Sequence, residues 1–479
     1  MSIDATHPAY DAAAPDWSKI EDITRRKNLS RHLIELNPQD KSEENRQRNK
    51  AYKERAIFFA LSYQTVQGMI GTVYRRFPSL TAPTEMEYLK ANADGAGVSI
   101  DQQSQAVTDD VIRKGRAGIA VSFPEVQGQV SRADITSGRV VATIHRFEPE
   151  QIINWRTERQ GSLNKLSLVV VRQAQLAPKS DDQYEHEAHS IIREMFLDQP
   201  QDEDGNPVGE PVYRERQWTR ARDGVWQPGE VMTPTDATGA PWTEIPFTFI
   251  GAENNDESVD HPPMLGIVDL NVGHWRNSAD YEDSVWIAGQ AQPWMSGVTD
   301  DHIEMMKEHG MYVGSRSLLP VPSGETFSYA SAPPNPAVRQ AMLDKVDMMV
   351  ALGARIMQPG IQTKTATQAQ GEREASTSVL GLVANNVSDA YTQALSWVAQ
   401  YNGASDTDLV YEISQDFVEP EVSPQKLQQI MMGFLQGTMP LADYTRLMRR
   451  FGLFSDDTSD EDYAELLAPG GSGADTGGF

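Results

Sequence analysis

The segment LGIVDLNVGHWRNSADYEDSVWIA occupies residues 265–288 and has a clear helical pattern. Its apolar residues recur at intervals of three and four: Leu265, Val268, Val272, Trp275 and Ala279. Such spacing places them on one face of an α-helix. The pattern follows Pro262-Pro263. We therefore predict a long amphipathic helix over about 265–288.

A second long helix is predicted on the far side of a broken segment, residues 290–335, which is rich in Pro and Gly. Its apolar stripe consists of Val338, Met342, Val346, Met349, Gly353 and Ile356, and it ends before Pro359-Gly360. Inside the broken segment we expect one short helix near Asp300–His309, because acidic residues favour a helix N-terminus. Two long helices therefore flank a short insertion.

Residues 100–250 predict an antiparallel-rich α+β domain. A helix is expected over Asp101–Lys114. Strands are expected over 119–123, 140–147, 166–172, 190–197, 213–218, 224–227 and 245–250, separated by turn residues such as Asp223-Gly224. Before this domain, apolar residues recur at helical spacing from Tyr52 to Phe77 and predict one continuous helix over about 51–77, ended by Pro78.

The C-terminal third predicts further helices. A stripe from Val379 to Tyr401 indicates a long helix, and the segment before it, residues 357–369, is small and polar. Ser423-Pro424, Pro440 and Ser459 are typical helix starts. The Gly-rich end, 469–479, predicts a flexible tail.

Composition excludes several classes of protein. The chain has 68 Asp and Glu against 42 Lys and Arg, a net charge of −26, which argues against tight binding of nucleic acid over the whole surface. No cysteine is present, so disulfides, thiolate nucleophiles and cysteine metal sites are excluded. No apolar run is long enough for a membrane span, and the first ten residues predict no secretory signal. We expect a soluble chain made inside the cell.

Charge is not uniform along the chain. Between Lys19 and Arg55, basic residues outnumber acidic ones. The simplest interpretation of the basic residues from Arg25 to Arg55 is a solvated helix face.

Motifs for catalysis are missing. The sequence contains no phosphate-binding P-loop, no dinucleotide fingerprint after a strand and no Gly-x-Ser-x-Gly elbow. His186-Glu-Ala-His189 has the spacing of a metal pair but is expected in a solvated polar linker, and Asp202-Glu-Asp204-Gly205 is more typical of a hairpin turn than of a calcium loop. We expect no cofactor, no metal and no enzymatic activity.

Several blocks carry a resemblance over nearly the whole chain: His7-Pro-Ala-Tyr10, Tyr63–Gly71 with Arg75-Arg76, Gly115–Val121 with Pro124, Ile152–Arg156, Asp260–Pro263, Leu270–Tyr281, Leu352–Arg355 and Thr365–Thr367. In this order and spacing, they resemble the portal-like family of tailed bacteriophages, long labelled only as a phage domain of unknown function.

The resemblance implies an α+β phage portal fold. Its expected parts are an N-terminal region and wing (1–262), a stem helix (263–289), a clip (290–334), a second stem helix (335–356), a tunnel loop (357–369), a tunnel or wing helix with a following strand (370–422), a helical crown (423–468) and the flexible tail (469–479).

The implied function is that of a head–tail connector. Such proteins form a ring, usually a dodecamer, at one vertex of the capsid in the virion, after synthesis in the host cytoplasm. Double-stranded DNA passes through without sequence specificity during genome packaging and ejection. The implied partners are the large terminase, which is the separate ATPase, the head–tail adaptor, and the major capsid and scaffold proteins. No membrane is involved.

The resemblance also implies candidate site residues. The DNA-tunnel candidates are Arg355, Gln358, Gln362, Lys364, Gln368 and Arg373. The stem-seam candidates are Leu265, Val268, Val272, Trp275, Val338, Met342, Val346 and Met349. The clip candidates are Asp300, Asp301, Glu304, Lys307 and Arg316. Each tunnel cation has a simpler interpretation as a solvated lysine or a salt-bridged arginine. For the basic region from Arg25 to Arg55, the resemblance implies a surface that faces the capsid or scaffold protein, as the alternative to a solvated helix face.

The net negative charge of the chain agrees with a channel for DNA. A ring of acidic copies repels the DNA phosphates, so the DNA can pass through without being bound. Two alternatives stay open. One is another virion structural protein, such as a minor capsid or adaptor component. The other is a metal-dependent nuclease that uses acidic clusters.

Overall fold

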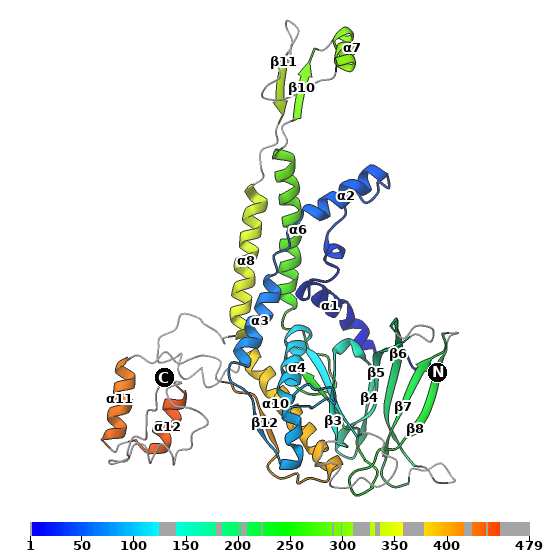
Figure 1. Cartoon of the computed structure of the whole chain (residues 1–479), viewed down its shortest axis with the longest axis vertical. Helices are drawn as coiled ribbons and strands as arrows, with labels where there is room; N and C mark the ends of the chain where they lie inside the picture. Colours follow the sequence, from blue (N-terminus) through cyan, green and yellow to red (C-terminus); the bar gives the residue numbers. More distant parts are fainter. Residues whose placement is uncertain are drawn as a thin grey trace. The chain divides into compact units, whose positions relative to one another are not determined.

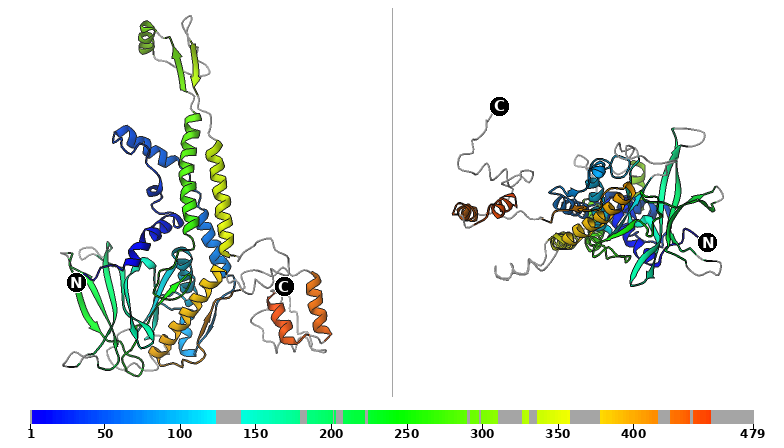
Figure 2. Two further views of the ribbon diagram at one scale, coloured as in Figure 1. Left: turned by 180° about the vertical axis from the view of Figure 1, so that it is seen from behind. Right: turned by 90° about the horizontal axis from the view of Figure 1, so that it is seen from below.

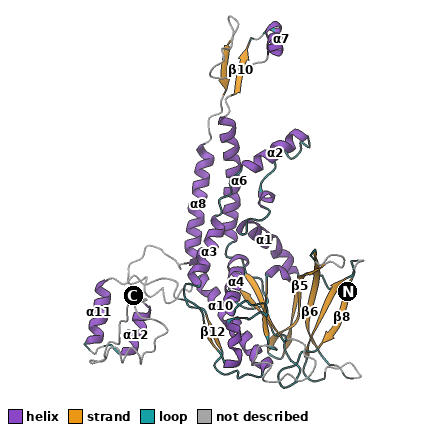
Figure 3. Cartoon of the chain, in the orientation of Figure 1, coloured by secondary structure: helices purple, strands orange, loops and turns teal. Residues whose placement is uncertain are grey.

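A computed structural model of the chain describes residues 2–123, 140–178, 184–200, 202, 208–221, 224–289, 292–297, 299–309, 326–330, 336–357, 378–415, 424–436 and 439–450. The chain divides into two compact units, Met1–Ile413 and Ser414–Phe479. The first unit combines helices with several sheets, and the described part of the second is helical (Figure 3). The predicted α+β class is confirmed.

The largest sheet of the first unit is antiparallel and follows the order of the chain. Its strands are β4 (Ile152–Gln160), β5 (Leu163–Pro178), β6 (His186–Asp198), β7 (Val212–Arg220) and β8 (Trp226–Met232). Neighbouring strands that are joined in sequence form hairpins, the simplest antiparallel connection. On one face, Ile153, Val170 and Ile192 form a buried cluster, against which Trp218 and Trp226 pack.

A smaller sheet of three strands lies in the order β3 (Thr143–Phe147), β2 (Arg116–Ser122) and β9 (Phe247–Gly251). The central strand β2 is buried over almost its whole length. Helices α4 (Ile100–Lys114) and α10 (Val379–Asn402) both pack against this strand, which explains its burial.

The strand predictions are confirmed in number and order for the seven expected strands, with shifted ends. β4 was not predicted as a strand; a turn, Gly161-Ser162, joins it to β5. The prediction that His186-Glu-Ala-His189 lies in a polar linker is wrong. These residues begin β6 and pair with residues 175–178 of β5, so the two histidines form part of a ladder.

The boundary between α4 and β2 has a clear local cause. Ser99 and Gln102 form a capping box at the start of α4, which satisfies its first free N–H groups. Gly115 ends the helix with a φ of 76°, a conformation that favours glycine. A Cβ at Gly115 would lie 2.7 Å from the carbonyl oxygen of Asp260, so the close approach of this backbone also requires glycine.

The first helices contradict one prediction. The N-terminal elements are α1 (Pro8–Thr24), the short 3-10 helix η1 (Leu29–His32), α2 (Glu43–Arg55) and α3 (Leu61–Val73). The predicted continuous helix over 51–77 is wrong, because residues 56–60 are not helical. We call residues 25–55 the arm and residues 56–60 the strap. The backbone of the strap is held by side chains of a later helix, described below.

The two predicted long helices are present as α6 (Leu265–Gly289) and α8 (Pro336–Met357), which lie side by side (Figures 1 and 2). Gly266 lies beside Leu352 and Gly273 beside Lys345. Residues that come later in α6 therefore contact residues that come earlier in α8, so the two helices are antiparallel.

The segment between α6 and α8 contains more structure than predicted. The short helix α7 (Asp300–His309) matches the expected bounds, and the strands β10 (Gln292–Ser296) and β11 (Thr326–Ala330) pair antiparallel around it. We call β10, α7 and β11 the hairpin module. By connectivity, it joins the C-terminus of α6 to the N-terminus of α8.

Helix α10 begins at the Ser378 cap and ends at Gly403. Strand β12 (Val410–Glu412) pairs antiparallel with β1 (Ser79–Thr81) and packs on α10. Two short 3-10 helices complete the unit: η2 (Thr84–Lys90) and η3 (Pro149–Gln151).

The second unit contains two described helices, α11 (Pro424–Leu435) and α12 (Leu441–Arg450), at the two predicted helix starts. Ile430, Tyr444 and Met448 form its buried cluster. The predicted helix over 460–467, the Ser459 cap and the flexible tail lie outside the described residues.

Candidate functional site

The candidate site is centred on the pair of long helices, α6 and α8. Small residues allow these two helices to pack closely. Gly266 and Gly273 of α6 face Leu352 and Lys345 of α8, and a Cβ at Gly273 would meet the Lys345 Cε at 3.0 Å. On α8, Met349 is fully buried. Small residues on one helix and long ones on the other fill the space between two close axes.

The predicted seam residues of α8 lie on the buried side of that helix. Met349 is fully buried, and Val338, Met342 and Val346 are half-buried. These positions repeat at intervals of three and four, as expected for helix packing.

The predicted seam residues of α6 face a different neighbour. Val268, Val272 and Trp275 are buried and Leu265 is half-buried. Trp275 forms a core cluster with Ala279, Leu33 and Tyr52. The part of the apolar stripe formed by Trp275 and Ala279 is therefore covered by the arm of the same chain.

The arm is tied to α6 by polar contacts as well. The Tyr52 hydroxyl donates to the Asp280 carboxylate at 2.7 Å, and Arg276 Nε donates to the His32 carbonyl at 2.9 Å. Arg55 pairs with Asp283 and lies 4.5 Å from the centroid of the Trp286 ring. Burial raises the pKa of Tyr52, and the hydrogen bond to Asp280 acts in the same direction.

The strap is held by two polar residues of α6, seven positions apart. Asn271 Nδ2 donates to the Phe59 carbonyl at 2.9 Å, while Asn271 Oδ1 accepts from the backbone N–H and the hydroxyl of Ser62 at 3.1 and 2.8 Å. The Ser278 hydroxyl donates to the Ile57 carbonyl at 2.7 Å and accepts from the Ile57 N–H at 3.2 Å. These side chains satisfy backbone groups that a continuous helix would have paired internally.

Sequence reasoning missed these anchoring residues. Asn271 and Ser278 interrupt the apolar pattern of α6 on one face, since a spacing of seven residues returns to the same side of a helix. Buried polar residues at such positions indicate a specific partner. The two polar positions could be seen in the sequence, but the sequence did not show that their partner is the strap.

A buried ion cluster joins α1 to α4. Arg113 contacts the carboxylates of Glu21, Asp109 and Asp110 at 2.6–3.1 Å. Burial raises the pKa of Asp110 to about 7, against the opposing effect of Arg146 and Arg113. Burial also acts to raise the pKa of Glu21, but Lys114 and Arg113 outweigh it and bring that pKa to about 2. This cluster orients α1, which in turn packs on α6.

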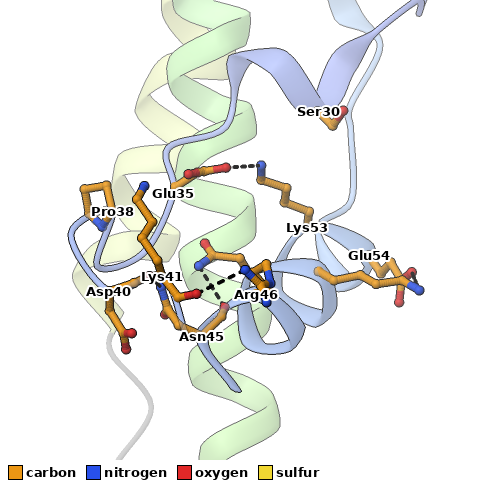
Figure 4. Close-up of a pocket in the computed structure, with 11 residues that line it drawn as sticks. Ser30, Glu35, Pro38, Asp40, Lys41, Asn45, Arg46, Lys53 and Glu54 are labelled. Atoms are coloured by element: carbon orange, nitrogen blue, oxygen red, sulfur yellow. Dashed lines mark hydrogen bonds and ion pairs between the residues drawn. The ribbon is translucent and has the colours of Figure 1, made fainter. Parts of the chain in front are cut away.

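The basic arm is largely neutralised by its own acids. A pocket beside α2 is lined by four cations and three carboxylates: Lys41, Arg46, Lys50, Lys53, Glu35, Asp40 and Glu54 (Figure 4). Within this region Arg46 pairs with Glu43 at 2.6 Å, and Lys53 pairs with Glu35 at 3.5 Å. These contacts fit the interpretation of a solvated helix face more closely than that of a concentrated cationic site.

The other candidates lie in two places. The clip candidates Asp300, Asp301, Glu304 and Lys307 are all exposed on α7, which therefore presents a polar and mainly acidic surface. Arg355 is exposed near the C-terminus of α8. The remaining tunnel candidates, Gln358, Gln362, Lys364, Gln368 and Arg373, lie outside the described residues, as do Arg316 and nearly all of the predicted tunnel loop.

Two searches of the described residues concern other functions. Among them, no group of three or more His, Cys, Asp or Glu side chains could hold a metal ion. None of the described helices combines the length and apolar character needed to cross a membrane.

Comparisons with known proteins give one family match. The model of a family described as "Domain of unknown function (DUF4055)" matches residues 263–402, which span α6, the hairpin module, α8 and α10. A comparison with curated proteins finds no match.

Solved structures similar to the chain include two chains from the necks of GTA particles. A chain in the neck of a native GTA particle, computed with C12 symmetry, is 13% identical with a TM-score of 0.39, over 82% of this chain and 89% of that one. A chain in the neck of an empty GTA particle, computed with C6 symmetry, is 13% identical with a TM-score of 0.37, over the same shares of both chains.

Proposed function

We propose that this chain is a portal protein, the head–tail connector of a tailed bacteriophage or a related particle. The observation that carries the proposal is the antiparallel helix pair α6–α8, which joins an α+β body to the small hairpin module. The sequence resemblance implies the same order of wing, stem, clip and second stem helix. The broader form of the proposal is that the chain is a structural protein of the virion.

In this role, identical copies form a closed ring around the path of the DNA. A contact between two different surfaces of the same chain produces a ring whenever the rotation between neighbours closes. The ring is proposed to be a dodecamer at one capsid vertex, and to interact with the major capsid and scaffold proteins around it.

The charge of the chain suits passage of DNA rather than its retention. A net charge of −26 per copy repels phosphate, and scattered cations such as Arg355 supply backbone contacts without sequence readout. DNA enters through the ring during packaging and leaves through it during ejection. The ring performs no chemistry in this process, and the terminase supplies the ATPase.

The hairpin module is the proposed docking surface for the large terminase and later the head–tail adaptor. Its helix α7 exposes Asp300, Asp301, Glu304 and Lys307. Polar and charged surfaces of this kind suit partners that must exchange, because rim charges affect association rate and specificity more than final affinity.

Particle assembly with and without the chain tests the proposed function. We expect particles assembled without it to contain no nuclease-protected DNA, and the supplied chain to restore protection. Reversal of the acidic surface of α7 by Asp300→Lys and Asp301→Lys should leave the chain folded but prevent this restoration. Full DNA protection in particles that lack the chain would contradict the proposal.

A further inference from the structure

Helix α8 carries two apolar seams, and its own chain covers only one of them completely. The first seam, with Met349 at its centre, faces α6. Since each residue advances about 100° around a helix, Val350 lies about 100° and Leu343 about 120° from Met349 in the same direction. Gly353 at about 40° and Val346 at about 60° lie between Met349 and Val350. We call Leu343, Val346, Val350 and Gly353 the flank seam.

The flank seam is covered at one end and bare at the other. A Cβ at Gly353 would lie 3.2 Å from Thr65 Cγ2, so α3 packs over this end. Further along, Val350 is 57% exposed and Leu343 is 49% exposed. Residues spaced by three and four form a surface that fits another helix, and the covered end shows that the seam does accept one.

The strap leads directly into α3 and carries further exposed apolar residues. Ile57 is 61% exposed and Phe59 is 41% exposed. Beneath the strap, His274 is buried next to the Phe59 ring, and its Nδ1 has no hydrogen-bond partner among the described residues.

The opposite flank of α8 has a complementary character. Met348 lies about 100° from Met349 in the other direction and is 53% exposed. Asp344 lies on the same flank, and among the described residues it accepts a hydrogen bond only from Gln340, one turn away, at 2.7 Å. On the flank-seam side, the exposed Arg339 has no ion pair among the described residues.

We propose that the flank seam of one copy packs against the Met348 flank of α8 in a second copy of this chain. Leu343 of one copy meets Met348 of the next, and Arg339 meets Asp344. Both pairs have an offset of five residues, about 7–8 Å along the helix. When two identical helices pack in parallel, every pair of contacting residues is shifted by the same number of residues. The Leu343–Met348 and Arg339–Asp344 pairs meet this requirement.

The occupant is a second copy because both complementary surfaces belong to the same helix. One flank carries an apolar row with a free cation, and the other carries an apolar residue with an acid. Two different flanks in contact form a heterologous interface, which builds a ring when the rotation between neighbours closes and does not build a two-fold dimer. The inference rests on the proposed portal function and names the surfaces that close its ring.

Disulfide trapping tests the proposed register, because the chain has no cysteine of its own. The double variant Leu343→Cys with Met348→Cys should give a ladder of covalent oligomers on oxidation, up to a closed ring. Each single variant should give no covalent product, since like positions do not meet. A matched control, Leu343→Cys with Leu163→Cys, uses an exposed residue of the large sheet and should give no ladder.

Charge reversal tests the same contact without cysteines. Arg339→Glu and Asp344→Arg should each raise the protein concentration at which rings dissociate by about tenfold, and the two together should restore it. Far-UV circular dichroism confirms that each variant is folded.

The outcomes separate this inference from the proposed function. A ring-forming chain without the ladder, or with dimers from the single variants, would overturn the proposed surfaces and leave the portal proposal in place. A chain that forms no ring under any assembly condition would contradict both.

Discussion

Helices α6 and α8 have 25 and 22 residues and pack on each other, yet their surroundings differ. Eight residues of α6 are buried, and Leu33 and Tyr52 of the arm cover Trp275 and Ala279. Among the described side chains of α8, the only large apolar one that is fully buried is Met349, while Leu343, Met348 and Val350 are each about half exposed. Exposed apolar side chains on α6 are confined to its C-terminal end, at Val285, Trp286 and Ile287, whereas on α8 they lie in the middle of the helix.

This difference separates two contributions to stability. Contacts of α6 form when a single chain folds, so their loss lowers the free energy of folding. In the proposed ring, the bare flanks of α8 contact only another molecule, so the loss of these contacts should leave folding unchanged and weaken assembly. The comparison predicts a graded series of effects on the unfolding of the dissociated chain.

The largest effect is expected for Trp275→Ala. The side chain is 5% exposed and packs on Leu33, Tyr52 and Phe58. Its removal leaves a cavity and should lower the free energy of unfolding by about 3–5 kcal/mol. Urea denaturation followed by circular dichroism measures the change. A loss below about 1 kcal/mol would show that the arm does not enclose α6.

A smaller effect is expected for Asn271→Ala. The substitution leaves the N–H and hydroxyl of Ser62 and the carbonyl of Phe59 without their partner. Buried groups that lose a hydrogen-bond partner should cost about 1–3 kcal/mol. Hydrogen exchange at residues 56–62 should rise in the same variant, whereas unchanged protection there would contradict the role of the strap.

Tyr52→Phe should have a smaller effect still. It removes only the hydroxyl that donates to Asp280 at 2.7 Å and keeps the ring in its cluster. Asp280 is exposed and can be solvated, so we expect a loss of about 1 kcal/mol. The same denaturation curve measures it, with wild-type chain as the reference.

The smallest effect on folding is expected for Leu343→Ala, because half of this side chain is already in water. Its unfolding free energy should stay within about 0.5 kcal/mol of the wild-type value. Ring stability in the same variant should fall. A variant that destabilises the single chain as strongly as Trp275→Ala would show that α8 is covered within the chain.

The helices could be predicted where the spacing of apolar residues in the sequence matches the side of the helix that is buried in the structure. The stripe from Leu265 to Ala279 predicted α6, and the acidic start at Asp300 predicted α7 with matching bounds. The break between α2 and α3 could not be predicted in this way. Apolar residues keep helical spacing from Tyr52 to Phe77, and the backbone of the non-helical strap is instead held by the distant side chains of Asn271 and Ser278.

The site was predictable in part for the same reason. Periodicity identified Trp275 and Met349 as packing positions, but not which neighbour each would meet. Trp275 meets Tyr52, more than 200 positions away, and a single sequence contains no record of that contact. The hairpin strands β10 and β11 were missed because each is short and the segment around them is rich in Pro and Gly.

The mass of the assembled protein tests the central claim most directly. Mass photometry of the purified chain, combined with negative-stain images, should reveal a closed ring with a central hole. Twelve copies of the 53.2 kDa chain give about 640 kDa. A particle of this kind is the predicted result. A chain that stays at 53.2 kDa at every concentration, and also when capsid and scaffold proteins are present, would contradict the account.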